Sequence, residues 1–353
     1  MPDLDVHGKN ERGESMMNFR EALLKNRNPV GTRKIHFVER TSRDVLEQAD
    51  ALPFWSQDYT QLDRGSFTGS IMSVTGRNMQ IFRESMNRAV DQIASAPEDT
   101  YVIGIPTIIE GDASWGGVQV KSDSLITLDK NGELLFRTSH FSEITAAVIS
   151  AEHLEEYAGK VEGIDLRKLM DNVNPVEIIP TDVAQRLLSA LNSSTNYISK
   201  SSGDPNIQHI LRHFEDNLLD TCLQALLHAS DCKERHYDQR IHRYIVSRVR
   251  DLTLSIDGDC LTIGEICINL RISRRTLNHA FSRVLGITPV EYMRNLRLHR
   301  VRSELQSSPY ETTIANIAAK WGFWHMSLFS RYYRELFGES PSETLLLSKE
   351  LDK

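Results

Sequence analysis

Apolar residues recur at helical spacing over the last third of the chain, and the same arrangement occurs twice. The segment GITPVE at 286–291 returns as GESPSE at 338–343. The apolar positions before each copy also coincide, as the pairs Leu277 and Phe329, Phe281 and Tyr333, and Leu285 and Phe337. Spacings of three and four residues are typical of a helix with one buried face. The sequence therefore predicts one small helical unit that is present twice.

Each copy is predicted to contain a helix, a short turn and a second helix. The patterns place helices at about 262–269 and 273–285, at 289 to about 305, and at 313–320 and 325–337. Thr288 with Glu291, and Ser340 with Glu343, predict capping boxes, each with a proline at the first helical position. Because a helix-turn-helix lays its second helix in the major groove of DNA, the repeat predicts two DNA-reading units joined by a long helix.

The first half of the chain has the pattern of a β-rich domain. From residue 29 to about 150, short apolar runs with many β-branched and aromatic residues are separated by Gly, Asp, Asn and Pro. A small barrel or sandwich follows from this spacing, with the strand order left open. A helix is predicted from Thr181 through Leu191, followed by a loop over 192–205.

A longer helix begins after Asp204 and Pro205, and it carries one apolar stripe. The stripe either faces a second copy of the protein or packs on the β-rich domain, and the two interpretations stand as equals. The chain is thus divided into a polar segment over 1–28, a β-rich sensor domain with trailing helices over 29–200, a connecting or dimerisation helix over 201–235, and a double helix-turn-helix DNA-binding domain over 236–353. The predicted fold class is multidomain α+β, with an all-α C-terminal domain.

Composition and charge narrow the class of protein. The chain has 353 residues, of which 40% are hydrophobic and 25% charged, and its beginning is polar and acidic. No run of about 18 apolar residues occurs, so neither membrane insertion nor secretion is predicted, and the expected location is the cytoplasm. The net charge is −7, but 240–349 holds 16 Lys and Arg against 10 Asp and Glu. A basic reading head on an acidic domain explains this asymmetry.

The candidate DNA-binding residues are those that face away from the buried side of each second helix. In the first unit, Ser273 is placed as the N-cap, so the outward residues lie at the end of the helix that reaches base edges. Arginine holds guanine by two hydrogen bonds, asparagine does the same for adenine, and a methionine contacts the thymine methyl group. The candidates are Arg274, Arg275, Asn278, His279 and Ser282 in the first unit, and His325, Met326, Ser327, Ser330 and Arg331 in the second.

Four arginines lie on the long helix between the units. Because their spacing prevents them all from facing one surface, a mixture of phosphate contacts and internal ion pairs is expected. They are Arg294, Arg297, Arg300 and Arg302.

The β-rich half offers only a few candidates for a small-molecule site. Trp55 and Tyr59 are candidates for lining an apolar pocket, although core packing is the better explanation for each such aromatic taken alone. Arg83 is a candidate for holding an anionic ligand, or it faces solvent. His36, His140 and His153 are isolated, without HxH or HxxxH spacing, the four cysteines are scattered, and no GxSxG or phosphate loop occurs. We therefore expect no enzyme, no metal and no cofactor; the alternative is a cupin-like, metal- or small-molecule-dependent enzyme fused to a helical module.

The segment from about 240 to 345 resembles a known family. The motifs SRRTL at 273–277, GITPVEY at 286–292, IANIAAKWGF at 314–323 and HMSLFSRYYRELFGESPSE at 325–343 are similar to the DNA-binding domain of the AraC/XylS family of bacterial transcription regulators. Three departures from the family pattern are His279 in place of arginine, Cys267 in place of alanine, and Thr344 with Leu345 in place of Tyr-Arg.

A shorter stretch of the first half resembles one branch of that family. PFWSQDYTQLDRGSFTGS at 53–70, with MQIFRES at 79–85, is similar to the start of the sensor domain in ethanolamine operon regulators. This resemblance implies a cupin-like β domain ahead of the DNA-binding head. The family resemblance also implies RNA polymerase as a partner and activation of transcription. Promoter DNA and a small-molecule effector of unknown identity are the other expected partners, and the pairing of two chains is left open.

Overall fold

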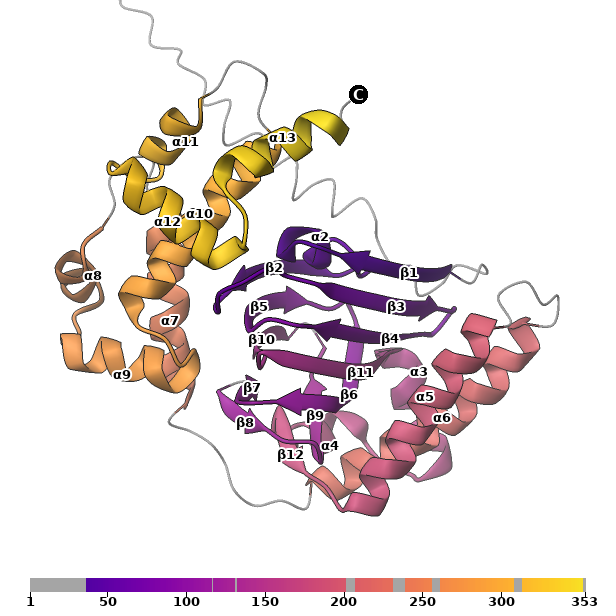
Figure 1. The fold of residues 1–353 in the computed structure, drawn as a ribbon. Helices are drawn as coiled ribbons and strands as arrows, with labels where there is room; N and C mark the ends of the chain where they lie inside the picture. The colour runs from indigo at the N-terminus through magenta and orange to yellow at the C-terminus, as the bar shows by residue number, and fades with distance from the viewer. Residues whose placement is uncertain are drawn as a thin grey trace, which may run out of the picture.

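The computed structural model describes residues 36–115, 117–130, 132–200, 207–230, 239–255, 261–307 and 313–351. Within these ranges a β-rich N-terminal part is followed by a helical C-terminal part (Figure 1). The polar segment predicted over 1–28 lies outside the described residues. No helix in the described ranges has the length and apolar character that crossing a membrane requires.

Twelve strands in the described part of the chain form two antiparallel sheets. The larger sheet has the order β1 (His36–Ser42), β3 (Gly69–Thr75), β4 (Met79–Met86), β11 (Phe141–Ser150), β6 (Thr100–Glu110), β9 (Ser124–Leu128) and β12 (Val176–Ile178). The smaller has the order β2 (Ser56–Gln61), β5 (Val90–Ser95), β10 (Glu133–Arg137), β7 (Ala113–Trp115) and β8 (Val118–Val120). Phe82 and Val102 of the larger sheet share one apolar cluster with Ala94 and Phe136 of the smaller, so the sheets pack face to face.

Helices cover the outer face of the larger sheet. Along β4, Ile81 packs outward with these helices whereas Phe82 packs inward, as the two-residue period of a strand requires. The covering helices are α3 (Ala151–Val161), α4 (Leu166–Met170), α5 (Thr181–Lys200) and α6 (Ile207–Ser230), and the short α2 (Val45–Ala49) precedes β2. In Figure 1, α5 and α6 lie side by side.

The sequence prediction of a loop from residue 192 was wrong, because α5 continues to Lys200. The hydroxyls of Ser194 and Thr195 donate to the carbonyl oxygens of Ala190 and Leu191, at 2.7 and 3.1 Å, so these polar residues are satisfied inside the helix. From Leu218 onward, the apolar residues of α6 belong to the same buried cluster as α5 and the sheet. This part of the stripe is therefore covered within one chain.

The C-terminal part consists of helices that agree with the predicted ones to within about two residues. They are α7 (Gln239–Leu254), α8 (Ile263–Leu270), α9 (Arg274–Val284), α10 (Pro289–Ser307), α11 (Ile314–Lys320), α12 (Met326–Phe337) and α13 (Pro341–Leu351). The repeated glycines Gly286 and Gly338 follow α9 and α12 with φ of 68° and 76°, a conformation that favours glycine. The capping box is formed in both directions at Ser340 and Glu343, whereas at Thr288 only the hydroxyl accepts from the Glu291 N–H.

Each copy of the unit has its own apolar core. One cluster joins Val249 of α7, Phe281 of α9 and Leu296 in the first half of α10. The other joins Leu305 in the second half of α10 with Ile317 of α11. The long helix α10 therefore contributes side chains to both cores.

Candidate nucleic-acid interface and its contact with the β-rich part

The helix α9 presents polar residues on the face opposite its core. The Ser273 Oγ accepts from the Thr276 N–H at 3.0 Å, which begins the helix with a side-chain cap. Leu277, Ala280, Phe281 and Val284 are buried on the inner face. The predicted reading residues are all exposed, namely Arg274, Arg275, Asn278, His279 and Ser282.

The helix α12 has the same layout with different chemistry. Its inner face buries Phe329, Tyr333, Leu336 and Phe337. Of the predicted residues, Ser330 is half-buried and the others are exposed, namely His325, Met326, Ser327 and Arg331. The sequence reasoning missed Trp324 and Leu328, which are 74% and 41% exposed beside them. An apolar residue out of phase with the buried stripe was the signal available for Leu328.

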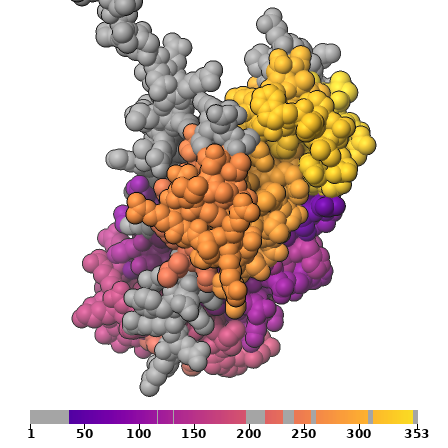
Figure 2. Space-filling view, turned by 90° about the vertical axis from the view of Figure 1, so that its left-hand side faces the viewer, coloured from indigo at the N-terminus to yellow at the C-terminus, as the bar shows by residue number. Residues whose placement is uncertain are grey.

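In Figure 2 the C-terminal helices, coloured orange to yellow, form the face turned to the viewer in front of the β-rich part. The first copy exposes two arginines and an amide at the start of α9, and the second exposes apolar side chains with Ser327, His325 and Arg331.

Each of the four arginines of α10 has a partner inside the molecule, and phosphate contacts of these arginines stay a prediction. Arg294 lies 3.7 Å from Glu291 and over the ring of Tyr332, and Arg297 donates to the Met293 carbonyl oxygen at 3.2 Å. Arg300 and Arg302 pair with carboxylates of the β-rich part. The internal ion pairs that the sequence predicted for this helix are therefore present at Arg294, Arg300 and Arg302.

Two carboxylates at the edge of the smaller sheet hold the helical part. Asp58 of β2 forms ion pairs with Arg250 of α7 and, at 3.7 Å, with Arg300 of α10. Asp91 of β5 accepts from the Tyr292 hydroxyl at 2.7 Å and lies 4.0 Å from Arg250. Burial raises the pKa of Asp91, against the attraction of Arg250. The residues in these contacts lie far apart in the sequence, and no local pattern indicated that they would meet.

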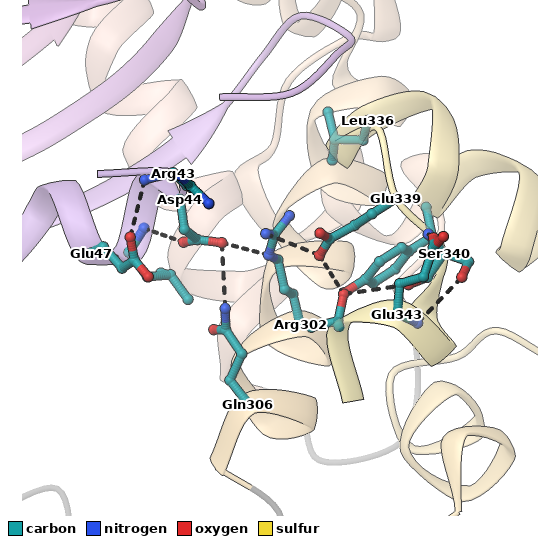
Figure 3. Close-up of polar contacts among 12 residues, drawn as sticks. Arg43, Asp44, Glu47, Arg302, Gln306, Leu336, Glu339, Ser340 and Glu343 are labelled. Carbon is teal, nitrogen blue, oxygen red and sulfur yellow. Dashed lines mark hydrogen bonds and ion pairs between the residues drawn. The ribbon is translucent and has the colours of Figure 1, made fainter. Parts of the chain in front are cut away.

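A third carboxylate completes the contact from the α2 side (Figure 3). Asp44 caps α2 by accepting from the Leu46 N–H at 2.6 Å, and its other oxygen lies 2.5 Å from the Arg302 Nε. The second guanidinium edge of Arg302 lies 3.1 Å from Glu339, at the start of the turn before α13. The side chains of Arg302 and Asp44 are only 9% and 4% exposed, so this ion pair is held away from water.

Main-chain contacts extend the same interface. The Gln61 N–H donates to the His299 Nε2 at 2.9 Å, and the Gln61 side chain donates to the Leu336 carbonyl oxygen at 2.6 Å. Burial lowers the pKa of His299 to about 4, so the imidazole is neutral and available as an acceptor at neutral pH. Leu62 packs in the apolar core of the first unit. The helical part is therefore firmly docked on the end of β2.

The C-terminal half of α9 borders a cleft of about 530 Å³ against β7 and β8. His279 lies in this cleft beside His242, with a nitrogen-to-nitrogen distance of 3.3 Å, and Ser282 and Arg283 lie in it too. Arg137 lines the cleft from the β-rich part. The predicted reading residues are thus divided: Arg274, Arg275 and Asn278 lie outside the cleft lining, whereas His279 and Ser282 face the neighbouring part of the chain.

The three residues predicted for the effector site also lie in different places. Trp55 and Tyr59 line a cavity between the two sheets. Arg83 does not, because it points to the outer face of β4, where it donates to the Asn192 side chain of α5 at 2.6 Å and lies 4.0 Å from Glu143. Arg83 is therefore outside this cavity, and its candidacy for holding an anionic ligand stays a prediction. No group of three metal-binding side chains occurs in the ranges that the structure describes.

Comparisons with known proteins concentrate on the helical part. A family profile described as a helix-turn-helix domain matches residues 266–346. The chain is 35% identical over 86 residues to a probable thc operon regulatory protein from Rhodococcus erythropolis, covering 24% of this chain and 26% of that protein. It is 27% identical over 164 residues to a XylDLEGF operon transcriptional activator from Pseudomonas putida, covering 46% and 39%. These relatives are thus matched over much less than half of their lengths.

Among solved structures, one similar chain is a probable AraC family transcriptional regulator from Rhodopseudomonas palustris CGA009. The sequence identity is 30%, the match covers 30% of this chain and 97% of that one, and the TM-score is 0.28.

Proposed function

Since the chain belongs to the AraC/XylS family of transcription regulators, we propose that it binds promoter DNA through α9 and α12 and regulates transcription there. The observation that carries this proposal is the shared layout of α9 and α12. Each buries one face in its own core and exposes an outward row of side chains that begins at its N-terminal end. That end of a recognition helix reaches base edges in the major groove.

The two helices are treated as the second members of two helix-turn-helix units. Their separation is set by α10, whose 19 residues span about 28 Å at ~1.5 Å each. One turn of DNA is about 34 Å long, so two units at this separation suit neighbouring major-groove segments. Arg275 and Asn278 are assigned to base contacts, with Arg274 beside them on the exposed end of α9.

The β-rich part is proposed as a cupin-like sensor domain. Its internal cavity is the proposed effector site, with Trp55 and Tyr59 among the lining residues. Activation with RNA polymerase as partner is proposed because one relative is named a transcriptional activator. A second copy of the chain is not required to cover the apolar residues of α6 from Leu218 onward, which are buried internally.

The DNA-binding proposal is tested by selecting sites from a random duplex library with the full chain. Arg275→Ala and Asn278→Ala are then compared with the wild type on the selected site and on an unrelated duplex. Loss of one two-bond base contact weakens specific binding by about 5- to 150-fold, while binding to the unrelated duplex changes little.

The matched control is Arg248→Ala, since Arg248 is a half-exposed arginine of the same helical part that pairs with Asp251 on α7. It is expected to leave the preference for the selected site unchanged. A selection that enriches no sequence, or α9 variants that retain full affinity for the selected site, would refute the proposal. Transcription in vitro from a promoter with the selected site distinguishes activation from repression.

A further inference from the structure

The cleft between α9 and the strands β7 and β8 is lined mostly by polar side chains (Figure 1). Its volume of about 530 Å³ is within the range of small-molecule sites, which is roughly 300–1,000 Å³. Gln119 of β8 and Arg137 of β10 line it from the β-rich part, and Ser282 of α9 lines it from the helical part. This cleft shares no lining residue with the cavity between the two sheets. Both parts of the chain therefore contribute hydrogen-bond donors to one separate space.

Two guanidinium groups lie in this lining without a carboxylate partner. Arg137 donates to the Asp112 carbonyl oxygen at 2.8 Å, and neither Arg137 nor Arg283 forms an ion pair with any residue that the structure describes. Burial lowers the pKa of Arg137, and the attraction of Asp112 acts against this shift. Asp112 is exposed and is the single carboxylate among the lining residues. Two positive charges thus face one negative charge, so the cleft favours an anion.

The position of Arg137 is fixed by the turn after α9. A Cβ at Gly286 would lie 2.6 Å from the Arg137 Nη1, so this glycine leaves room for the guanidinium. Beside it, the Ser114 hydroxyl of β7 donates to the Val284 carbonyl oxygen at 3.3 Å and joins β7 to the end of α9. Donors that are held in place before a ligand arrives reduce the entropy cost of binding.

This set of donors matches a phosphate group. A guanidinium forms two parallel hydrogen bonds with a phosphate or with a carboxylate. A phosphate group has three terminal oxygens and a charge of about −2, so it accepts from two guanidiniums and from further donors, whereas a carboxylate has two oxygens and one charge. We propose that the cleft binds a small phosphate-bearing molecule, whose phosphate is held by Arg137 and Arg283 and whose remaining atoms contact His279 and Ser282.

The cleft and the predicted DNA-reading face share residues. His279 follows Arg275 by four positions and Ser282 follows Asn278 by four, so the outward row of α9 continues from one pair to the other. Of these residues, His279 and Ser282 line the cleft. A molecule in the cleft therefore covers one end of the row and holds α9 against β7 and β8. Its binding and DNA binding oppose each other, by the same factor in both directions.

Phosphate groups have two possible sources here, a free molecule and the DNA backbone. A DNA strand is continuous, so a backbone in the cleft would have to pass the point where Ser114 and Val284 are in contact. A free molecule has no such requirement, and this favours it as the occupant. The effect on DNA rests on the proposed function, whereas the binding of phosphate does not.

The first test is isothermal titration calorimetry of the full chain with sodium pyrophosphate, and with sodium acetate at the same ionic strength. One pyrophosphate is expected to bind per chain, and acetate is expected not to bind. Arg137→Gln and Arg283→Gln each remove a charged donor, and each is expected to weaken pyrophosphate binding by about 10-fold or more.

Arg334→Gln is the matched control. Arg283 and Arg334 are the basic residues in the last turns of α9 and α12, and Arg334 does not line the cleft. This control is expected to bind pyrophosphate as the wild type does. Circular dichroism and Tm without ligand establish that each variant is folded. Because Arg283 is exposed, its variant tests the site even where loss of Arg137 disturbs the contact with Gly286.

The second test is affinity for a DNA site selected without pyrophosphate, measured with pyrophosphate or with NaCl at the same ionic strength. At about five times its dissociation constant, pyrophosphate is expected to lower the affinity of the wild type by about 6-fold and that of Arg283→Gln by less than about 2-fold. Pyrophosphate binding that leaves DNA affinity unchanged overturns the coupling of the two sites.

Three results overturn the phosphate site itself: no pyrophosphate binding, equal binding in the wild type and both cleft variants, or equal binding of acetate. If the DNA backbone occupies the cleft instead, pyrophosphate does not bind, and both variants bind an unrelated duplex more weakly, with a salt slope reduced by about 1. A chain that binds pyrophosphate as expected but selects no DNA sequence refutes the proposed function and retains the site.

Discussion

Replacing Arg302 by an uncharged residue tests how much its ion pair with Asp44 stabilises the contact between the β-rich part and the helical part. Arg302→Met keeps the length of the side chain and its contact with Phe337, over whose ring the guanidinium lies at 4.5 Å. It leaves Asp44 without its cation at a site that is 4% exposed. Breaking a buried ion pair from one side costs about 3–5 kcal/mol, because one charge stays buried and unpaired.

A second substitution separates this cost from lost packing. Asp44→Asn in the Arg302→Met background removes the stranded charge and retains a residue that caps α2. We expect it to restore about 2 kcal/mol or more of the free energy of unfolding lost in the single variant. The control is Arg186→Met, whose pair with Asp182 is 67% and 72% exposed and contributes less than about 1 kcal/mol.

The assay is urea denaturation followed by circular dichroism and tryptophan fluorescence, with each transition fitted separately. A loss below about 1 kcal/mol in Arg302→Met, or no recovery with Asp44→Asn, would show that the ion pair does not hold the parts together.

Three further predictions concern the same interface. Gly338→Ala places a Cβ 2.4 Å from the Ser66 Oγ at a φ of 76°, so it is expected to lower Tm more than Gly163→Ala does. At Gly163 φ is 66° and no atom lies within 4 Å of the added Cβ, so this control measures only the backbone cost of about 1–2 kcal/mol. Equal losses of Tm in the two variants would contradict the prediction. Tyr292→Phe removes a hydrogen bond to the Asp91 carboxylate and should lower the free energy of unfolding in urea by about 1.5–3 kcal/mol. The control is Tyr333→Phe, which removes a hydrogen bond to the Thr344 hydroxyl inside the helical part and should cost about 0.5–1.5 kcal/mol. A larger loss in the control would exclude a strong hydrogen bond across the interface. The folded-state pKa of His299 is lowered from 6.5 to about 4, so as the pH falls the unfolded chain binds a proton at this residue before the folded chain does. The neutral imidazole therefore contributes its full stabilisation above pH 6.5, and this contribution is lost as the pH falls toward 4. The difference in urea midpoint between the wild type and His299→Gln should shrink across this window, and parallel pH profiles would refute the prediction.

The helices of the C-terminal part could be predicted because their signals are local. The N-cap Ser273 lies within three residues of the N–H that it accepts from, and Gly286 and Gly338 end their helices by their own backbone conformation. The outward position of Arg274, Arg275 and Asn278 follows from the same helical period. The specific DNA contacts assigned to them stay a prediction.

The docking interface could not be predicted, because its residues have no local signature. Asp58 and Asp91 alternate with apolar or neutral residues on strands, and this pattern is typical of a solvent-facing carboxylate. Arg300 and Arg302 lie on the helix between two DNA-reading units, where the sequence predicted a mixture of phosphate contacts and internal ion pairs without saying which arginine does which. Only the fold brings Asp44 and Arg302 together. For the same reason the sequence suggested Trp55 and Tyr59 but passed over Glu84, which lines the same cavity.

The two copies of the helical unit are alike where they pack and unlike where they face outward. The buried positions repeat as Phe281 and Tyr333, and the glycine and proline that follow repeat as well, because each unit must build the same small core. The exposed rows are under no such requirement, and α9 carries Arg275 and Asn278 where α12 carries Ser327 and Ser330. Donors that form two bonds distinguish bases, whereas serines and apolar groups discriminate less. The proposal therefore assigns base specificity mainly to α9, and the bases opposite α9 should be the more strongly enriched half of any selected site.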